Sequence, residues 1–197
     1  MRTLGDALNA ADRARYEDAR RLMDANRPSE ALQIYEALAR EGDPNCQVFV
    51  GWMFYSGHGT KTDKELGLEW FGKAAVLGSA AGAFYCGRHA AKVGKYEEAL
   101  RYFHQAAAKQ YSPALFWLGL CHTRGYGVEK SEEKAVGYYK RAAAGGNLFA
   151  RRALAVMMIK GKFGPLQIPL GLVLFPAYVV AAIVDGATKG YTERLIA

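Results

Sequence analysis

The sequence predicts an all-α fold, a solenoid of about five helix-turn-helix repeats that ends in an apolar helix. The first observation is internal repetition, because the stretch 51–78 aligns to 119–146 without a gap, with glycines and paired aromatics at matching positions. The second is a helical spacing of apolar residues through most of the chain. The third is an uncharged stretch of 22 residues, 163–184. Repetition at this period is typical of helical hairpins that stack on their neighbours.

The first repeat is predicted as two helices joined by a short turn. The first helix is expected over 12–26, with Tyr16 and Ala19 on its apolar stripe. Ser29 stands where it could cap the second helix. The sequence Gly42-Asp43-Pro44 is expected to end that helix and begin the next, since glycine suits a helix C-terminus and proline the first turn.

The second and fourth repeats carry a long glycine loop between their helices. Gly57 and Gly59 reverse the chain in the second repeat, and glycines recur at the matching positions of the fourth. Thr62 and Glu65 have the spacing of a capping box for the helix that follows. In the third repeat a tight turn at 93–96 replaces the loop.

Small residues are predicted where the two helices of one repeat cross. Gly51 is expected to face Ala74-Ala75, and Gly119 is expected to face Ala142-Ala143, so that the helices approach closely. The neighbouring aromatics would then fill the groove beside the crossing. A leucine at either glycine would overpack it.

The two long motifs resemble Sel-one-like repeats, a branch of the tetratricopeptide superfamily. They read GWMFYSGHGTKTDKELGLEWFGKAA at 51–75 and GLCHTRGYGVEKSEEKAVGYYKRAA at 119–143, while GKYEEALRYFHQAA at 94–107 resembles a plain tetratricopeptide repeat. The resemblance covers about residues 12–160. It implies hairpins stacked into a right-handed superhelix that binds other proteins, often in signalling or cell-envelope pathways, without catalysis.

Matching positions on the first helices of the repeats are predicted to line a concave groove that binds a partner. Aromatic anchors interleaved with arginine suit a protein segment that bears carboxylates. The alternative is a solvated face with some packing between repeats. The predicted groove residues are Tyr16, Arg20, Val48, Trp52, Ser56, Phe84, Arg88, Lys92, Phe116, Arg124, Arg152 and Lys160.

The fifth repeat departs from the pattern, which predicts a solenoid over 1–162, an apolar segment over 163–184 and a polar tail over 185–197. A helix that is apolar on every face must be buried in something. Membrane contact, the apolar surface of a partner or a second copy, and burial as a terminal cap all remain open. The residues expected to contact a membrane are Leu166, Ile168, Leu170, Leu172, Leu174, Phe175, Tyr178, Val179 and Ile183.

The length of the apolar segment leaves its relation to a bilayer open. One helix of this length would reach about 33 Å, but Pro169 and Pro176 shorten or kink it to nearer 25 Å. A kinked monotopic segment, a re-entrant segment and a single crossing therefore all fit. The basic residues just before it are placed to meet anionic headgroups on the cytoplasmic side, namely Arg151, Arg152, Lys160 and Lys162.

Composition narrows the function further. The net charge is +7, and residues 100–197 alone hold 13 Lys and Arg against 5 Asp and Glu, which favours an acidic partner. The three cysteines fall in apolar helical pattern and are expected to be buried thiols. A metal site from Cys86, His89, Cys121 and His122 is disfavoured because the usual paired spacings are missing. No catalytic residue, metal or cofactor is expected.

The function expected from these features is that of a non-catalytic scaffold. Its partners would be proteins in the groove and membrane lipid at the apolar end, with a homodimer through that end also open. It would lie at the cytoplasmic side of the cell membrane, since the N-terminus lacks the apolar run of a signal peptide. The alternative is a soluble self-associating adaptor or an enzyme regulatory subunit. Nucleic acid is not expected, because the basic residues follow no single stripe.

Overall fold

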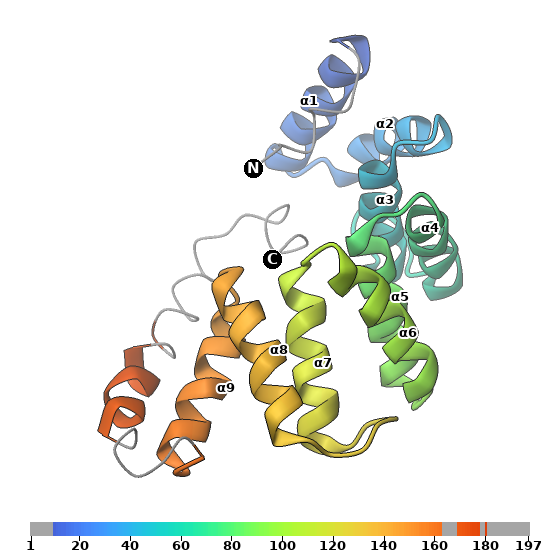
Figure 1. Cartoon of the computed structure of the whole chain (residues 1–197). Coiled ribbons are helices and arrows are strands. Elements are labelled where there is room, and N and C mark those ends of the chain that lie inside the picture. The colour runs from blue at the N-terminus through green and yellow to red at the C-terminus, as the bar shows by residue number, and fades with distance from the viewer. Residues whose placement is uncertain (1–9, 163–168, 178–179, 181–197) are drawn as a thin grey trace. The chain divides into compact units, whose positions relative to one another are not determined.

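The computed structural model describes residues 10–162, 169–177 and 180. Its helices alternate direction as antiparallel hairpins, and no strand occurs in the described part, which confirms the all-α helical-repeat solenoid (Figure 1). The long helices are α1 (Ala10–Asp24), α2 (Pro28–Arg40), α3 (Pro44–Ser56), α4 (Lys64–Val76), α5 (Ala80–Lys92), α6 (Tyr96–Ala108), α7 (Ser112–Arg124), α8 (Glu132–Ala144) and α9 (Leu148–Ile159).

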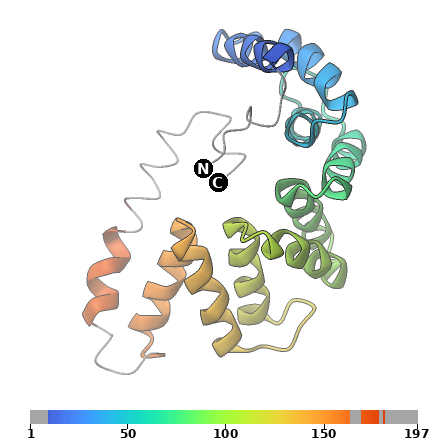
Figure 2. The same cartoon turned by 45° about the horizontal axis from the view of Figure 1, so that its top comes forward.

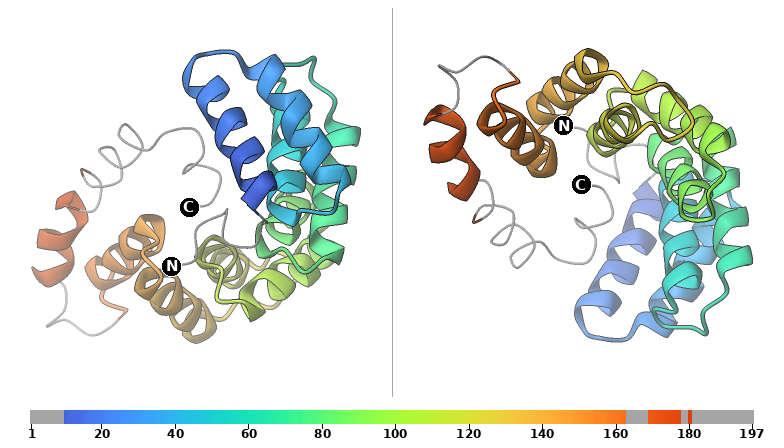
Figure 3. Two further views of the ribbon diagram at one scale, coloured as in Figure 1. Left: turned by 90° about the horizontal axis from the view of Figure 1, so that it is seen from above. Right: turned by 90° about the horizontal axis from the view of Figure 1, so that it is seen from below.

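The chain forms two compact units, one up to Cys86 and one from Gly87 onward. In the first unit α1 and α2 lie side by side as an antiparallel pair (Figure 3), and the Tyr16 and Tyr35 rings meet edge to face at 5.6 Å. In the second unit the connection between α7 and α8 is longer than the one between α5 and α6 (Figure 2). The long and short turns therefore lie where the glycine pattern predicts them.

Polar side chains and prolines set where the helices begin. Asp43 caps α3 by accepting a hydrogen bond from the Cys46 N–H at 2.6 Å, as the Gly42-Asp43-Pro44 sequence predicts. Asp63 caps α4 in the same way through the Leu66 N–H at 2.9 Å, so the predicted capping box from Thr62 is wrong by one residue. Ser29 caps nothing, because α2 already begins at Pro28.

One contact recurs in the hairpins that carry a glycine on the first helix. A Cβ on Gly51, Gly87 or Gly119 would lie 2.6–2.8 Å from an aromatic ring of the second helix. The small residues of the first helices are all buried and are Ala19, Gly51, Gly87, Gly119 and Ala155. Those of the second helices are also buried and are Ala31, Gly67, Ala99, Ala135 and Gly171. The aromatic residues four positions later are Tyr35, Phe71, Phe103, Tyr139 and Phe175.

The glycines of the crossing do not face the alanine pairs that the sequence analysis assigns to them. A Cβ on Gly51 would lie 2.8 Å from Phe71 Cδ1 and 2.9 Å from the Gly67 carbonyl oxygen. The pair Ala74-Ala75 instead faces the next hairpin, where a Cβ on Gly82 would lie 2.8 Å from Ala74 Cβ. The predicted partners are therefore wrong, although the crossing itself lies where the glycines predict it. Ala74 contacts the next hairpin, whereas Phe71 lies against Gly51 in its own hairpin and also stacks on Tyr85 of the next, with ring centroids 4.7 Å apart.

Each long loop lies over the first residue of the second helix in the preceding hairpin. A Cβ on Gly59 would lie 2.7 Å from the Pro28 carbonyl carbon, and one on Gly127 would lie 2.9 Å from Tyr96 Cβ. Tyr126 of the second loop stacks on Tyr96 with the ring centroids 4.8 Å apart. Both glycines have positive φ, at 76° and 67°. Glycine is therefore required there by backbone conformation and by close approach.

A fifth hairpin closes the described chain. Residues 169–177 are helical and lie beside α9 (Figure 1). A Cβ on Gly171 would lie 2.8 Å from Met158 Cβ and 2.9 Å from the Ala155 carbonyl oxygen. In the second hairpin, a Cβ on Gly67 would likewise lie 2.7 Å from the Gly51 carbonyl oxygen. The apolar stretch thus supplies the second helix of a repeat, and the solenoid boundary predicted at 162 falls inside this hairpin.

Candidate functional site

In the first unit the predicted groove residues divide into core and surface. Tyr16, Val48 and Phe84 are each only 7% exposed, so they pack between helices and offer little surface to a partner. The exposed residues of this set are Arg20, which pairs with Glu17 at 3.7 Å, and Ser56.

Trp52 is half-buried between its own helix and the glycine loop of its hairpin. The centroid of its ring lies 5.7 Å from that of Phe49 and 5.1 Å from that of His58. Part of this predicted anchor therefore holds the loop, and only part of its side chain is exposed.

In the second unit the first helices α7 and α9, with the residue that follows α9, carry the predicted groove residues Phe116, Arg124, Arg152 and Lys160. The Phe116 ring of α7 lies 6.0 Å from the Phe149 ring of α9, centroid to centroid. Phe149 is 59% exposed, which is unusual for so large an apolar side chain. We name this surface the basic face, and it consists of Phe116, Leu120, Arg124, Phe149, Arg152, Val156 and Lys160.

The basic face is ordered along both helices. Going toward the C-terminal end of α7, an aromatic residue is followed by Leu120 and then by exposed Arg124. Along α9 the position that corresponds to Phe116 holds exposed Arg152, followed by Val156 and, just past the end of the helix, by exposed Lys160. Phe149 lies three residues before Arg152. Sequence reasoning missed Phe149 because its position, in the first turn of the helix, is not one of the matching positions that were predicted to line the groove. Its only signal was a large aromatic residue where the earlier repeats have Asn45, Ala81 and Pro113.

Acidic residues are absent from the first helices of the second unit. Residues 87–162 hold 14 Lys and Arg against 5 Glu. Four of the five lie in the first turns of second helices, at Glu97 and Glu98 in α6 and at Glu132 and Glu133 in α8. The fifth, Glu129, lies in the loop before α8. No Asp or Glu occurs in α5, α7 or α9, and Arg88 and Lys92 on α5 are exposed. The first helices α5, α7 and α9 therefore carry basic residues and no acidic ones, while the second helices α6 and α8 carry both signs.

The outer side of the last helical segment is apolar and exposed. Leu170, Val173 and Val180 are 45%, 71% and 59% exposed, and Ala177 is exposed as well. These four residues, spaced as one face of a helix, are named the outer stripe. The matching positions of the fourth repeat are Lys134, Gly137, Arg141 and Ala144. Among the described residues, no helix is both long enough and apolar enough to span a membrane.

The residues predicted to contact a membrane are divided by the structure. Leu170 and Leu172 are exposed, the latter at 57%. Leu174 and Phe175 are half-buried, and the Arg152 guanidinium carbon lies 5.6 Å from the Phe175 ring centroid. Phe175 therefore belongs to the hairpin crossing. The others lie outside the described residues and are Leu166, Ile168, Tyr178, Val179 and Ile183.

Most of the residues predicted to meet lipid headgroups also hold the last hairpins together. Lys162 Nζ pairs with the Glu132 carboxylate at 2.7 Å, which ties the fifth turn to the start of α8. Arg151 Nε donates to the Ala143 carbonyl oxygen at 3.4 Å. Lys160 is exposed at the end of α9. Headgroup contact by these residues stays a prediction.

The cysteines are buried thiols, as the sequence predicts. Burial raises the pKa of Cys121 to about 11, and burial together with nearby Asp43 raises the pKa of Cys46 further still. Thiols with such pKa values stay protonated at neutral pH and are poor nucleophiles and metal ligands. Within the described part of the chain, no three His, Cys, Asp or Glu side chains are grouped so that they could hold a metal ion.

The hairpins match a known repeat. A family model for the Sel1 repeat matches residues 44–79, 81–111 and 112–147, which are 103 of the 197 residues. Among curated proteins, DAP3-binding cell death enhancer 1 of Rattus norvegicus is 34% identical over 79 residues, 40% of this chain and 16% of that protein. The ubiquitin-ligase component HRD3B of Arabidopsis thaliana, which is ERAD-associated, is 31% identical over 107 residues, 54% of this chain and 17% of that protein. The chain thus spans about a sixth of these relatives.

Solved structures agree with this fold. The Sel1 repeat protein from Oxalobacter formigenes superposes with a TM-score of 0.70 at 25% identity, covering 78% of this chain and 68% of that one. The protective antigen c5321 of uropathogenic Escherichia coli superposes with a TM-score of 0.73 at 24% identity, covering 92% and 43%. The glycine–aromatic contacts that recur in three hairpins and the family match over more than half of the sequence lead to one conclusion: this chain belongs to the Sel1 repeat family.

Proposed function

We propose that this protein is a non-catalytic adaptor that binds a protein partner on the first helices of its hairpins. Sel1 repeat proteins are typically adaptors that bind other proteins. The curated relative HRD3B is by its name a component of a larger ligase assembly. The observation that carries the proposal is the chemical asymmetry of the second unit, whose first helices expose aromatic and basic side chains and no acidic ones.

Site-specific photo-crosslinking in cells tests which side of the hairpins binds. Benzoylphenylalanine would replace one exposed residue at a time on the first helices, at Ser56, Arg88 and Arg124. Matched positions on the second helices, also exposed, are Lys73, Arg101 and Arg141. Discrete protein adducts are expected from the first set and not from the second. Adducts from the second set alone, or from neither, would contradict the proposal.

We also propose that the outer stripe rests on the cytoplasmic face of the cell membrane as a peripheral contact. The outer stripe replaces the charged residues of earlier repeats by apolar side chains that remain exposed. Monomeric soluble proteins seldom leave such patches uncovered without a use. Lys160 and Lys162 stand just before this segment and carry the charge that anionic headgroups attract. Self-association through the same stripe is the competing use.

Liposome flotation distinguishes these uses. The full chain is expected to float with vesicles of phosphatidylglycerol and phosphatidylcholine, and the pair Leu170→Glu and Val173→Glu is expected to lower the bound fraction at least about 5-fold, because charges are costly in an apolar layer. The control pair is Val76→Glu and Leu77→Glu, which changes residues of 87% and 54% exposure in the first unit and should float like the parent. A parent that stays with the soluble fraction contradicts membrane contact. A parent dimer that the first pair dissociates supports self-association instead.

A further inference from the structure

We infer that the partner of the basic face is an acidic protein segment that carries an aromatic or large aliphatic anchor. The inference rests on the proposed adaptor function and adds the chemistry of the partner. It commits to the surface of α7 and α9 in the second unit, where the Phe116 and Phe149 rings lie 6.0 Å apart and join the two helices.

Acidic residues are absent from the exposed positions of α7 and α9 as well as from their buried ones. Acidic side chains stabilise the first turn of a helix, and α6 and α8 both use them there, at Glu97, Glu98, Glu132 and Glu133. The first turns of α7 and α9 hold none, and Pro113, Ala114 and Ala150 in those turns are buried, where a carboxylate would be costly. The exposed positions of the two helices hold Thr123, Arg124, Phe149 and Arg152. A face that carries basic and no acidic residues repels positively charged partners and attracts negatively charged ones. The complementary partner here is negatively charged.

The order of side chains along the basic face defines the spacing within that partner. Phe116 and Arg124 are eight positions apart on α7, which is about 12 Å along a helix. An extended chain covers about 12 Å in three to four residues. Since α7 and α9 are both first helices, they run in parallel, so Arg124 and Lys160 lie at the same end. A segment with its anchor beside Phe116 would therefore place a carboxylate three to four residues away on Arg124. Lys160 lies eleven positions after Phe149, about 16 Å, which an extended chain covers in about five residues.

On this face, charged side chains are expected to orient the partner, and burial of an aromatic ring is expected to supply most of the binding energy. Exposed Arg and Lys give modest affinity singly but orient a carboxylate-rich segment, and Arg can bind a carboxylate with two parallel hydrogen bonds. Phe149 is 59% exposed and its ring would be covered by the anchor. Aromatic anchors of this kind commonly dominate binding energy. Single-stranded RNA would use the same charges but would require stacking platforms for successive bases.

A peptide selection with charge-reversal variants tests this inference. The intact chain would be used to select binders from a display library of random 12-residue peptides at near-physiological salt. Selected peptides would be synthesised with a fluorescent label, and their Kd measured by anisotropy. We expect an excess of Asp and Glu over Lys and Arg, with an aromatic or large aliphatic residue three to four positions from an acidic one.

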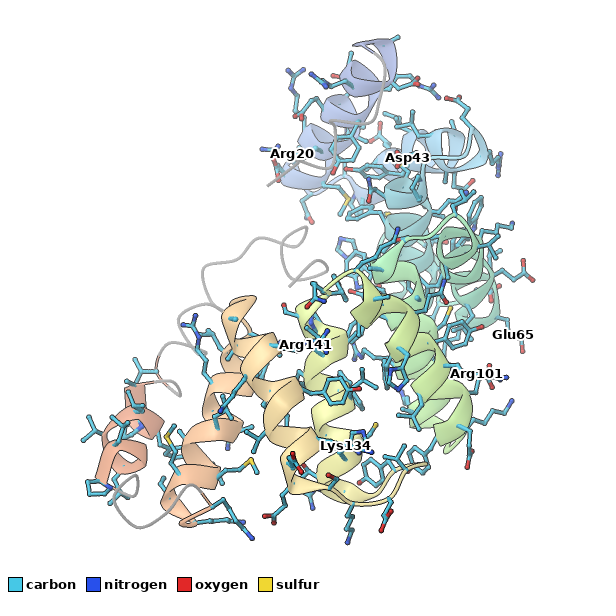
Figure 4. The ribbon with its side chains drawn as sticks, viewed as in Figure 1. Arg20, Asp43, Glu65, Arg101, Lys134 and Arg141 are labelled. Atoms are coloured by element: carbon cyan, nitrogen blue, oxygen red, sulfur yellow. The ribbon has the colours of Figure 1, made fainter. Side chains whose placement is uncertain are left out.

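The variants assign binding to the face. The pair Arg124→Glu and Lys160→Glu is expected to weaken binding at least about 10-fold, and Arg124→Lys with Lys160→Arg to stay within about 3-fold. The control pair Arg101→Glu and Lys134→Glu makes the same change in net charge on the exposed sides of α6 and α8 (Figure 4) and should stay within about 3-fold. Helicity measured by circular dichroism confirms that each variant folds.

Each other outcome overturns the inference. Neutral or basic peptides, equal losses from both charge-reversal pairs, or tighter binding of an oligouridylate than of any peptide would each contradict it. Neutral peptides that still depend on Phe149 would leave the adaptor proposal standing while removing the acidic partner. A selection without binders contradicts peptide recognition by this face, whereas cross-links at Ser56 or Arg88 would show that the adaptor function uses another surface.

Discussion

Replacing Gly51 by Leu is expected to lower the free energy of unfolding by about 1–3 kcal/mol or more, because an overpacked core must shift its neighbours. The first added atom would already lie 2.8 Å from Phe71 Cδ1 and 2.9 Å from the Gly67 carbonyl oxygen, so the helix itself has to move. Gly119→Leu should act similarly, with the new Cβ 2.6 Å from Tyr139 Cε1. Urea unfolding followed by circular dichroism measures both.

The chain supplies matched controls for these variants. Gly72 and Gly137 are also helical, and a Cβ at either position would meet nothing within 4 Å. Alanine there should be neutral or stabilise by up to about 1 kcal/mol, since glycine lowers helix stability. If Gly51→Leu and Gly119→Leu unfold like the parent, the crossing does not lie at these glycines and the register of the hairpins is wrong.

The fold could be read from the sequence because its signals are local and repeated. Positions such as Gly51 and Gly119 show their importance by recurring, and helical periodicity needs no knowledge of distant contacts. The partners of those glycines could not be read in the same way. Ala74-Ala75 and Phe71 lie on adjacent sides of one helix, and only packing against α5 decides which side faces the next hairpin.

The last hairpin shows why composition alone misleads. The uncharged stretch 163–184 looks unlike every earlier second helix, yet Gly171 and Phe175 stand at the repeat positions of Ala135 and Tyr139. Gly171 therefore packs against α9 at the position that the repeat predicts, although the composition of the segment differs from that of earlier second helices. What composition does report is the exposed side, where the outer stripe has lost its charges.

The candidate site stays a prediction. Arg124, Arg152 and Lys160 are exposed, as a binding surface requires. Tyr16, Val48 and Phe84 occupy matching positions of the earlier first helices, but they are buried. A position in the repeat gives the direction in which a side chain leaves its helix, whereas the exposure of that side chain depends on the neighbouring hairpin. Sequence spacing therefore could not separate the exposed predicted residues from the buried ones.

Truncation after Lys162 is expected to unfold much of α9, in addition to removing the segment itself. Without residues 169–177, the backbone around Ala155 and Met158 that Gly171 now covers would be open to water. The ion pair of Lys162 with Glu132 cannot replace this packing, because an exposed pair contributes about 1 kcal/mol or less. The matched control is truncation after Val184, which keeps the helical segment and should leave α9 as it is in the full chain.

Amide hydrogen exchange of α9, measured by mass spectrometry without lipid or detergent, tests most directly whether the chain is a run of hairpins in one register to its apolar end. The full chain and the chain ending at Val184 are predicted to protect Leu148–Ile159 equally. The chain ending at Lys162 is predicted to exchange there at least about 10-fold faster, the signature of local opening. Equal protection of α9 in all three chains would contradict the fifth hairpin.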